Sequence, residues 1–144
     1  MKKICLFIAA VTAGLLAGSI YAAPRFNPDQ LAEFMKTNQC IGCDLSGALI
    51  GRNHSGAVLT DANLSGIGMN ETEAFNFSQA NMQNANLTAA YLYTANFSGA
   101  YLKGAHFDGS DLTGANFFGA HDVNLSNANA CMATLPDGTK GACW

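Results

Sequence analysis

The chain has 144 residues, of which 49% are hydrophobic and only 12% are charged. Soluble globular domains usually carry about 25% charged residues, so a conventional charged surface is not expected. The length allows one domain, and the net charge of −3 excludes a basic patch that would bind nucleic acid. Alanine, glycine and asparagine occupy 24, 15 and 14 positions, a bias toward small and turn-forming residues.

Residues 1–22 have the pattern of a secretory signal peptide. Two lysines precede an apolar run over residues 4–20, and small residues follow it. We expect cleavage after Ala22, because a cut one residue later would leave Pro24 beside the scissile bond. The run is short for a membrane span, and Cys5 lies at its start, where it cannot direct lipidation. The sequence therefore predicts a periplasmic or secreted protein with no stable membrane anchor.

Residues 23–42 are predicted to form a short N-terminal capping α-helix and a linker. Asn27 suits the N-cap, Pro28 the first turn and Gln30 the third position. An apolar stripe then falls on one face of the helix, formed by Leu31, Phe34 and Met35. The residues that follow the helix form repeats, described next. Because a fold built from stacked repeats exposes its core at both ends unless something covers it, we expect this stripe to lie over the first coil of the repeats.

A strict period of five organises the rest of the chain. Large apolar residues stand at every fifth position: Phe77, Met82, Leu87, Leu92, Phe97, Leu102, Phe107, Leu112 and Phe117. Two residues before each stands Ala or Ser, except for Phe75. Helices repeat every three or four residues and strands every two, so the chain must instead turn a corner every five residues.

If four such units make one square coil, residues twenty apart stack at about 4.8 Å, the usual spacing between strands. This stacking would place Phe77, Phe97 and Phe117 in one inward column, and Asn76, Asn96 and Asn116 in an outward column beside it. Like side chains pack in register, and amide ladders form hydrogen bonds along such a stack. The columns therefore predict one continuous core.

Several units match one motif: Ala, then Asn or Asp, then Leu or Phe, then two variable residues. Examples are Ala-Asn-Leu-Thr-Ala (85–89), Ala-Asn-Phe-Ser-Gly (95–99) and Ser-Asp-Leu-Thr-Gly (110–114). The chain thus resembles the pentapeptide-repeat proteins over residues 43–130. The resemblance implies an all-β solenoid, a right-handed quadrilateral β-helix with four pentapeptides per coil. It implies no single function, because one fold carries unrelated roles.

The five-residue register breaks in three places. Residues 53–56 supply four residues between two units, whereas 69–77 and 117–125 each span eight. Each break must bulge or shift a face. The second break includes Glu71 and Glu73 in a segment that we interpret as an exposed loop.

Residues 131–144 leave the period and are predicted to form a C-terminal cap. Four cysteines follow the signal peptide: Cys40, Cys43, Cys131 and Cys143. An even number in an exported protein favours disulfides. Cys43 and Cys131 would lie about four coils, or roughly 20 Å, apart, whereas bridged Cα atoms lie within about 7 Å. The predicted pairs are therefore Cys40 with Cys43 and Cys131 with Cys143, although a Cys-Xxx-Xxx-Cys segment can also be a redox motif.

Little in the sequence indicates catalysis. His54 alone does not complete a zinc site, and no acid–base or nucleophilic set accompanies His106 or His121, so no catalytic, cofactor or metal residues are predicted. The outward aromatic residues Tyr91, Tyr93, Tyr101 and Phe118 form a candidate interaction surface, and we expect them to be distributed over different faces.

The sequence thus favours a non-enzymatic exported scaffold that binds an unknown protein partner and no nucleic acid, with self-association left open. Two alternatives remain. One is a DNA-mimicking topoisomerase-protecting protein, which the export signal and the modest acidity of residues 43–130 disfavour. The other is a thiol redox protein that uses Cys40 and Cys43.

Overall fold

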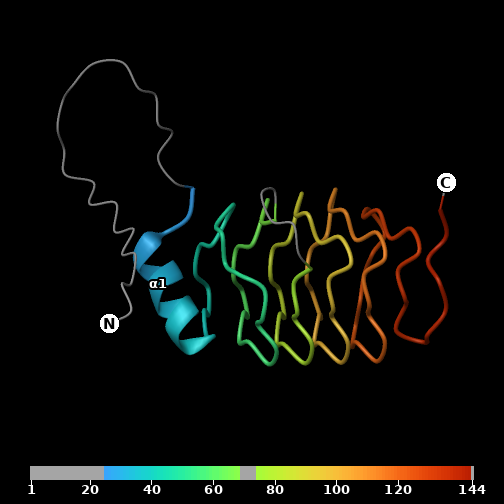
Figure 1. Ribbon diagram of the computed structural model, residues 1–144, viewed down its shortest axis with the longest axis horizontal. Coiled ribbons are helices and arrows are strands. Elements are labelled where there is room, and N and C mark those ends of the chain that lie inside the picture. Colours follow the sequence, from blue (N-terminus) through green and yellow to red (C-terminus); the bar gives the residue numbers. More distant parts are fainter. Residues whose placement is uncertain (1–24, 69–73, 144) are drawn as a thin grey trace, which may run out of the picture.

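The computed structural model describes residues 25–68 and 74–143 (Figure 1). One helix, α1 (Pro28–Thr37), lies against the N-terminal end of a stack of similar coils. The coils continue to the C-terminus along one axis. The predicted signal peptide at residues 1–22 and the segment that contains Glu71 and Glu73 lie outside the described residues.

Helix α1 is capped at both ends by asparagines. The Asn27 side chain accepts hydrogen bonds from the backbone N–H groups of Asp29 and Gln30, and Asn38 ends the helix in the left-handed conformation. Phe34 is fully buried against the first coil. Met35, expected beside it, is 54% exposed, because consecutive helical residues point about 100° apart. The part of α1 that covers the first coil is therefore narrower than predicted, because Met35 is largely exposed.

The coils have four faces, each defined by residues that pair in parallel from one coil to the next. The pairs are isolated single bridges, one on each straight segment. Face 1 comprises Gln39, Val58, Asn81, Tyr101 and His121; face 2 comprises Asp44, Asn63, Asn86 and His106; face 3 comprises Tyr91, Asp111 and Asn129; and face 4 comprises Asn53, Asn76, Asn96, Asn116 and Thr134.

The register breaks change the length of a coil and leave the columns aligned. Regular coils pair residues twenty apart, as in Asn76 with Asn96. The coil that includes residues 69–73 pairs Asn53 with Asn76, three residues more. The first coil is one residue shorter, and the last is two residues shorter, pairing Asn116 with Thr134. Faces 1 and 4 therefore keep their pairing through the 23-residue coil.

Each corner is a β-turn that sets the five-residue period. The N–H of the small inward residue donates to the C=O of the large inward residue three positions earlier, as in Ala95 to Leu92 at 3.0 Å. The residue before the small one has a positive φ, which type II turns require. Glycine fills this place in most units, for example Gly99 with φ 66°. One turn per unit accounts for the repeat.

Small and large inward residues together fill the core. The nine large residues of the repeat are at most 3% exposed. A column of aromatic rings runs through the core, formed by Phe34, His54, Phe77, Phe97 and Phe117. Phe97 and Phe117 stack with ring centroids 4.9 Å apart and planes 3° apart, and Phe107 meets both edge-on.

Replacing Phe97 tests how much this column contributes. The ring is fully buried and contacts Phe77, Phe107 and Phe117. Phe97→Ala should lower the free energy of unfolding by about 3–5 kcal/mol, because it removes buried area and leaves a cavity. Denaturant unfolding measures the loss. Ser98→Ala, in the next outward position, is the control, and an equal small loss in both variants would contradict the packing account.

Candidate interaction surface

Polar side chains on faces 2 and 4 bond mainly to one another. On face 4 the side-chain N–H of each Asn donates to the side-chain oxygen of the Asn one coil earlier, from Asn116 to Asn96 to Asn76 to Asn53. On face 2 the chain runs from Asn86 through Asn63 to Asp44. The same oxygens also accept a backbone N–H two residues later, as Asn96 does from Ser98. These amides are thereby engaged within the fold.

Exposed large apolar residues recur along face 3, in every second coil. Tyr91 and Tyr93 are 52% and 64% exposed and flank the buried Leu92. Leu49 precedes Ile50 at the equivalent place in the first coil, and Met132 follows Cys131 in the last. These four are half of the eight exposed large apolar residues in the described part of the chain. We call Leu49, Tyr91, Tyr93 and Met132 the face 3 cluster.

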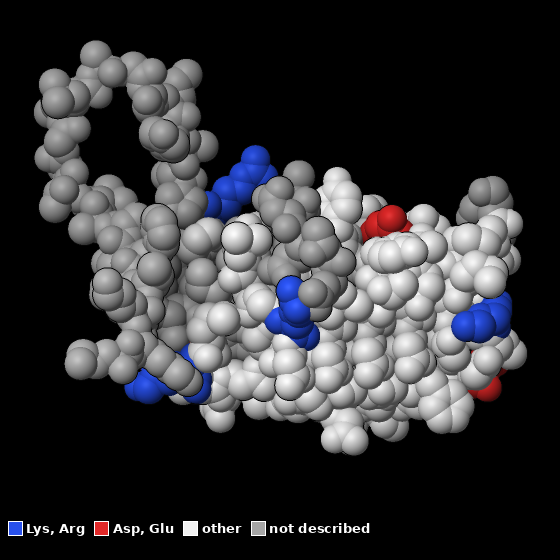
Figure 2. Space-filling view, in the orientation of Figure 1, with Lys and Arg blue, Asp and Glu red and all other residues white. Residues whose placement is uncertain are grey.

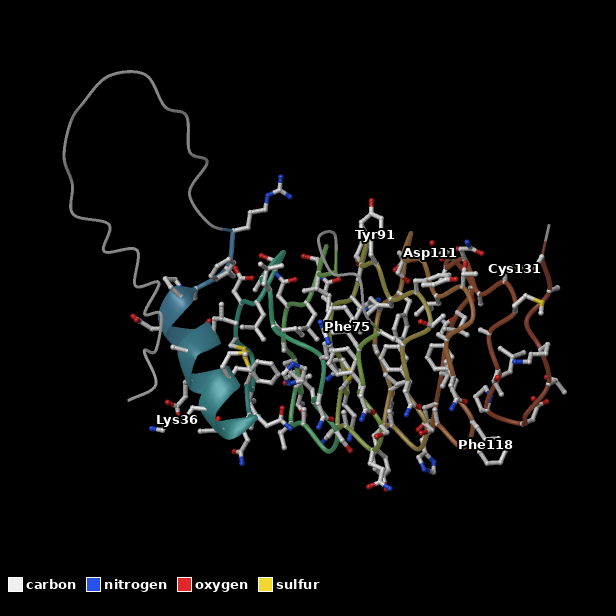
Figure 3. The ribbon with its side chains drawn as sticks, in the orientation of Figure 1. Lys36, Phe75, Tyr91, Asp111, Phe118 and Cys131 are labelled. Atoms are coloured by element: carbon white, nitrogen blue, oxygen red, sulfur yellow. A yellow bond between two sulfur atoms is a disulfide. The ribbon has the colours of Figure 1, made fainter. Side chains whose placement is uncertain are left out.

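The other two predicted aromatic residues lie elsewhere. Tyr101 belongs to face 1, where its ring stacks on His121 with centroids 4.7 Å apart. Phe118 follows Asn116 and Phe117 on face 4, and its side chain points to the side of the solenoid opposite Tyr91 (Figure 3). The expectation that all four aromatics are dispersed is therefore wrong for Tyr91 and Tyr93, which share one face because they flank the same inward residue.

The backbone around the tyrosine pair is tightly constrained. The N–H of Tyr91 donates to the C=O of Ile67 at 2.8 Å, and a Cβ on Gly68 would lie 2.2 Å from the Tyr91 carbonyl oxygen. Thr94, directly after Tyr93, has φ 54°. A β-branched residue rarely adopts this conformation. The corner turn imposes it here, as it does at other non-glycine corner residues such as Gln79 and Ala89.

Among the described residues, charged side chains near the face 3 cluster include exposed Arg52, three residues after Leu49, and Asp111. Asp111 stands one coil beyond Tyr91 on face 3, and its Oδ1 accepts hydrogen bonds from Thr113 and from Asn129. The view in Figure 2 shows a few isolated charged groups on an otherwise uncharged surface. Asp111 thus lies between Tyr91 and Met132 along face 3.

The structure pairs the four cysteines at the two ends of the solenoid. Cys40 and Cys43 form one disulfide with a Cα–Cα distance of 5.5 Å, and each is 6% exposed. Cys131 and Cys143 form the other, with a Cα–Cα distance of 4.5 Å. The first lies under helix α1 within the core, and the second lies at the C-terminal edge (Figure 3).

His54 is a core residue, which the sequence analysis did not recognise. Its Nε2 lies 2.7 Å from the Ile50 carbonyl oxygen and its Nδ1 lies 2.9 Å from Oδ1 of Asn38. The spacing of four from Ile50 and five to Leu59 could have placed it inward. Within residues 25–68 and 74–143, no three His, Cys, Asp or Glu side chains are arranged to hold a metal.

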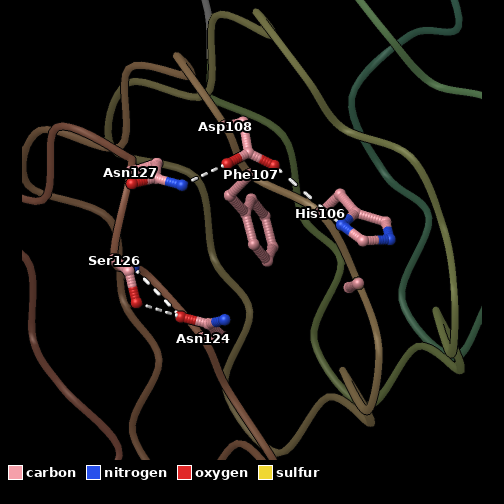
Figure 4. A pocket seen from close by; sticks show the side chains of 7 residues that line it. His106, Phe107, Asp108, Asn124, Ser126 and Asn127 are labelled. Carbon is pink, nitrogen blue, oxygen red and sulfur yellow. Dashed lines mark hydrogen bonds and ion pairs between the residues drawn. The ribbon is translucent and has the colours of Figure 1, made fainter.

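A small polar notch lies where the last register break opens face 2 (Figure 4). Across it, Asn127 donates to Asp108 at 2.6 Å, and His106 lies 3.9 Å from the same carboxylate. Among the described residues no bridge joins His106 to the next coil. The cavity of about 30 Å³ holds roughly two water molecules, far less than the volume of a metabolite site.

The repeat register, the β-turn at each corner and the four aligned faces together indicate one family. A model of pentapeptide repeats matches eight copies over residues 76–107 and 95–131. Residues 76–131 of this chain are pentapeptide repeats. The resemblance drawn from the motifs is thereby confirmed. No curated protein matches the chain.

Solved structures of pentapeptide-repeat proteins are also similar. One, from the thylakoid lumen of Arabidopsis thaliana, has 30% identity over 76% of this chain and 61% of its own, with a TM-score of 0.43. HetL, involved in heterocyst differentiation regulation in the cyanobacterium Nostoc, is 26% identical. The match covers 72% of this chain and 55% of HetL, with a TM-score of 0.39. The chain thus spans less than two thirds of the length of each of these two proteins.

No described helix is long and apolar enough to cross a membrane.

Relieving the strain at Thr94 should stabilise the protein. Thr94→Gly should raise the free energy of unfolding by about 1 kcal/mol, since the left-handed conformation costs an L-residue roughly 1–2 kcal/mol. Thermal and denaturant unfolding measure the change. Thr88→Gly is the matched control, because Thr88 is absent from the positive-φ positions and should lose stability as a glycine. A loss in both variants would show that Thr94 is unstrained.

Proposed function

We propose that this pentapeptide-repeat protein is an exported, non-enzymatic scaffold whose face 3 cluster binds a protein partner. The observation that carries the proposal is that four of the eight exposed large apolar side chains in the described residues lie along face 3, with Tyr91 and Tyr93 side by side on a single unit. Tyrosines are common anchors in protein interfaces because they bury large area and carry a polar group. The rigid solenoid holds both rings in a fixed relation.

The non-enzymatic part of the proposal rests on how the polar groups are used. The asparagine side chains of faces 2 and 4 are bonded within the ladders. Both ring nitrogens of His54 contact oxygens of the protein. The Cys40–Cys43 pair, which a thiol redox protein would need to expose, is buried. Catalysis needs groups that are free to act on a substrate in a concave site.

Export is supported by two independent features. Residues 1–22 have the charge, apolar run and small residues of a signal peptide, and both cysteine pairs are bonded. Disulfides persist mainly in oxidising compartments. The DNA-mimic alternative would require a continuous acidic row, whereas the described paired columns contain only two acidic residues, Asp44 and Asp111.

Removing the tyrosine pair should abolish partner capture. A Tyr91→Ala/Tyr93→Ala variant of residues 23–144 should lose, by at least about ten-fold, a crosslinked envelope protein that the unchanged chain captures, since interface hot spots contribute 2 kcal/mol or more. A Tyr101→Ala/Phe118→Ala variant removes two aromatics from other faces and is the matched control. Equal capture by all three proteins, with unchanged melting temperatures, would exclude the face 3 cluster as the binding surface.

A further inference from the structure

The two disulfides differ in access to solvent. Cys40 and Cys43 are both buried, beneath helix α1 and within the core. Cys143 is exposed and Cys131 is partly buried. Thiol–disulfide exchange requires a thiolate to approach a sulfur atom along the disulfide, so access decides which bond reacts in the folded protein. The reactive pair in this fold is therefore at the C-terminus, although the Cys-Xxx-Xxx-Cys spacing belongs to the other pair.

The C-terminal disulfide holds a short segment against the edge of the last coil. Residues 139–143, here called the C-terminal segment, turn back after Pro136 and pair antiparallel through Lys140 and Thr134. The Met132 N–H donates to the Gly141 C=O at 3.1 Å, and the Gly141 N–H donates to the Ala133 C=O at 2.8 Å. These bonds occupy an edge that another chain could otherwise extend.

Gly141 lets the segment approach this edge closely. A Cβ built on Gly141 would lie 2.1 Å from the carbonyl oxygen of Ala130, so any side chain there would push the segment away. Lys140 adds hydrogen bonds from Nζ to Oγ1 of Thr134 at 2.8 Å and to the Met132 carbonyl at 3.4 Å. The Leu135 N–H also donates to the Thr139 C=O at 2.8 Å. Thr139, Lys140 and Cys143 are exposed, and the disulfide is the covalent bond that ties this exposed segment to the last coil.

We propose that Cys143 is the attack site of an external dithiol, and that reduction of Cys131–Cys143 alone releases the C-terminal segment from the last coil. A thiolate of the dithiol attacks Sγ of Cys143, the bond between the two sulfurs breaks, and Cys131 leaves as a thiolate that takes up a proton. The second thiol of the reductant then attacks the mixed disulfide and frees Cys143. The dithiol ends as a disulfide, and the cysteine pair has gained two electrons and two protons.

Release uncovers the edge formed by Met132 and Ala133 without opening the repeat core. The Met132 N–H and the Ala133 C=O lose their partners on Gly141. Inner coils keep their ladders, because their bonds run between coils and not to the C-terminal segment. Reduction of Cys131–Cys143 therefore changes only the C-terminal end of the solenoid. Met132, a member of the face 3 cluster, lies at that end. This inference does not depend on which partner the scaffold binds.

Timed reduction of residues 23–144 tests the proposal. Folded protein is treated with dithiothreitol, quenched with N-ethylmaleimide at intervals, and analysed by peptide mass spectrometry. Label should appear on Cys131 and Cys143 at least ten-fold faster than on Cys40 and Cys43, whereas in guanidinium the two pairs should be labelled at similar rates. Equal rates in the folded protein, or earlier label on Cys40 and Cys43, would overturn the proposal.

Two further measurements test release itself. Hydrogen exchange at the Met132 and Gly141 amides should speed up after selective reduction, while the Leu64 amide, which donates to Asn86 at 2.7 Å in an inner coil, should be unchanged. Gly141→Ala should accelerate reduction of Cys131–Cys143 several-fold, and Ala142→Ser, at the exposed next residue, should not. Unchanged exchange at both amides after reduction would show that the segment stays in place and would overturn the release.

Discussion

The structure depends on one packing constraint: every five residues, two inward side chains, in most units one small and one large, must enter the same narrow core. The large residues of the repeat are buried, and a β-turn between units brings the chain round to the next face. The small position holds Ala in most units, whereas at Phe75 it holds a buried ring that stacks on Phe77, so the two inward positions together fill an interior packed close to crystal density. The turns, faces and ladders all follow from this filling rule.

The constraint explains how far the sequence could be interpreted. It predicted the inward residues and the coil of twenty, and the structure has Phe97 and Phe117 stacked in register. Local exceptions were harder. His54 occupies an aromatic place because one corner is a residue shorter, which the strict period conceals. Tyr91 and Tyr93 share a face because they flank the inward Leu92, and the five-residue register of the sequence was sufficient to predict this. The exposure of Met35 depends on how α1 is rotated over the coil, and a helical pattern leaves that rotation open.

The same ladders that stabilise the solenoid limit its chemistry. Asparagines that would otherwise be free to contact a ligand bond along the stack, and the Cys-Xxx-Xxx-Cys pair is enclosed by helix and core. The apolar side chains of the face 3 cluster and the exposed disulfide at the C-terminal edge are not used in this way. A rigid scaffold with one apolar face and one reducible end is consistent with a protein that acts by binding.

The most direct measurement is site-specific photocrosslinking from single positions on different faces. A photoreactive phenylalanine analogue is placed at Tyr93 on face 3, at Tyr101 on face 1 or at Phe118 on face 4, three exposed aromatic positions of similar accessibility. The account predicts a discrete crosslinked partner from position 93 and none from the other two. Crosslinks of equal yield from all three positions, or from position 118 alone, would contradict it.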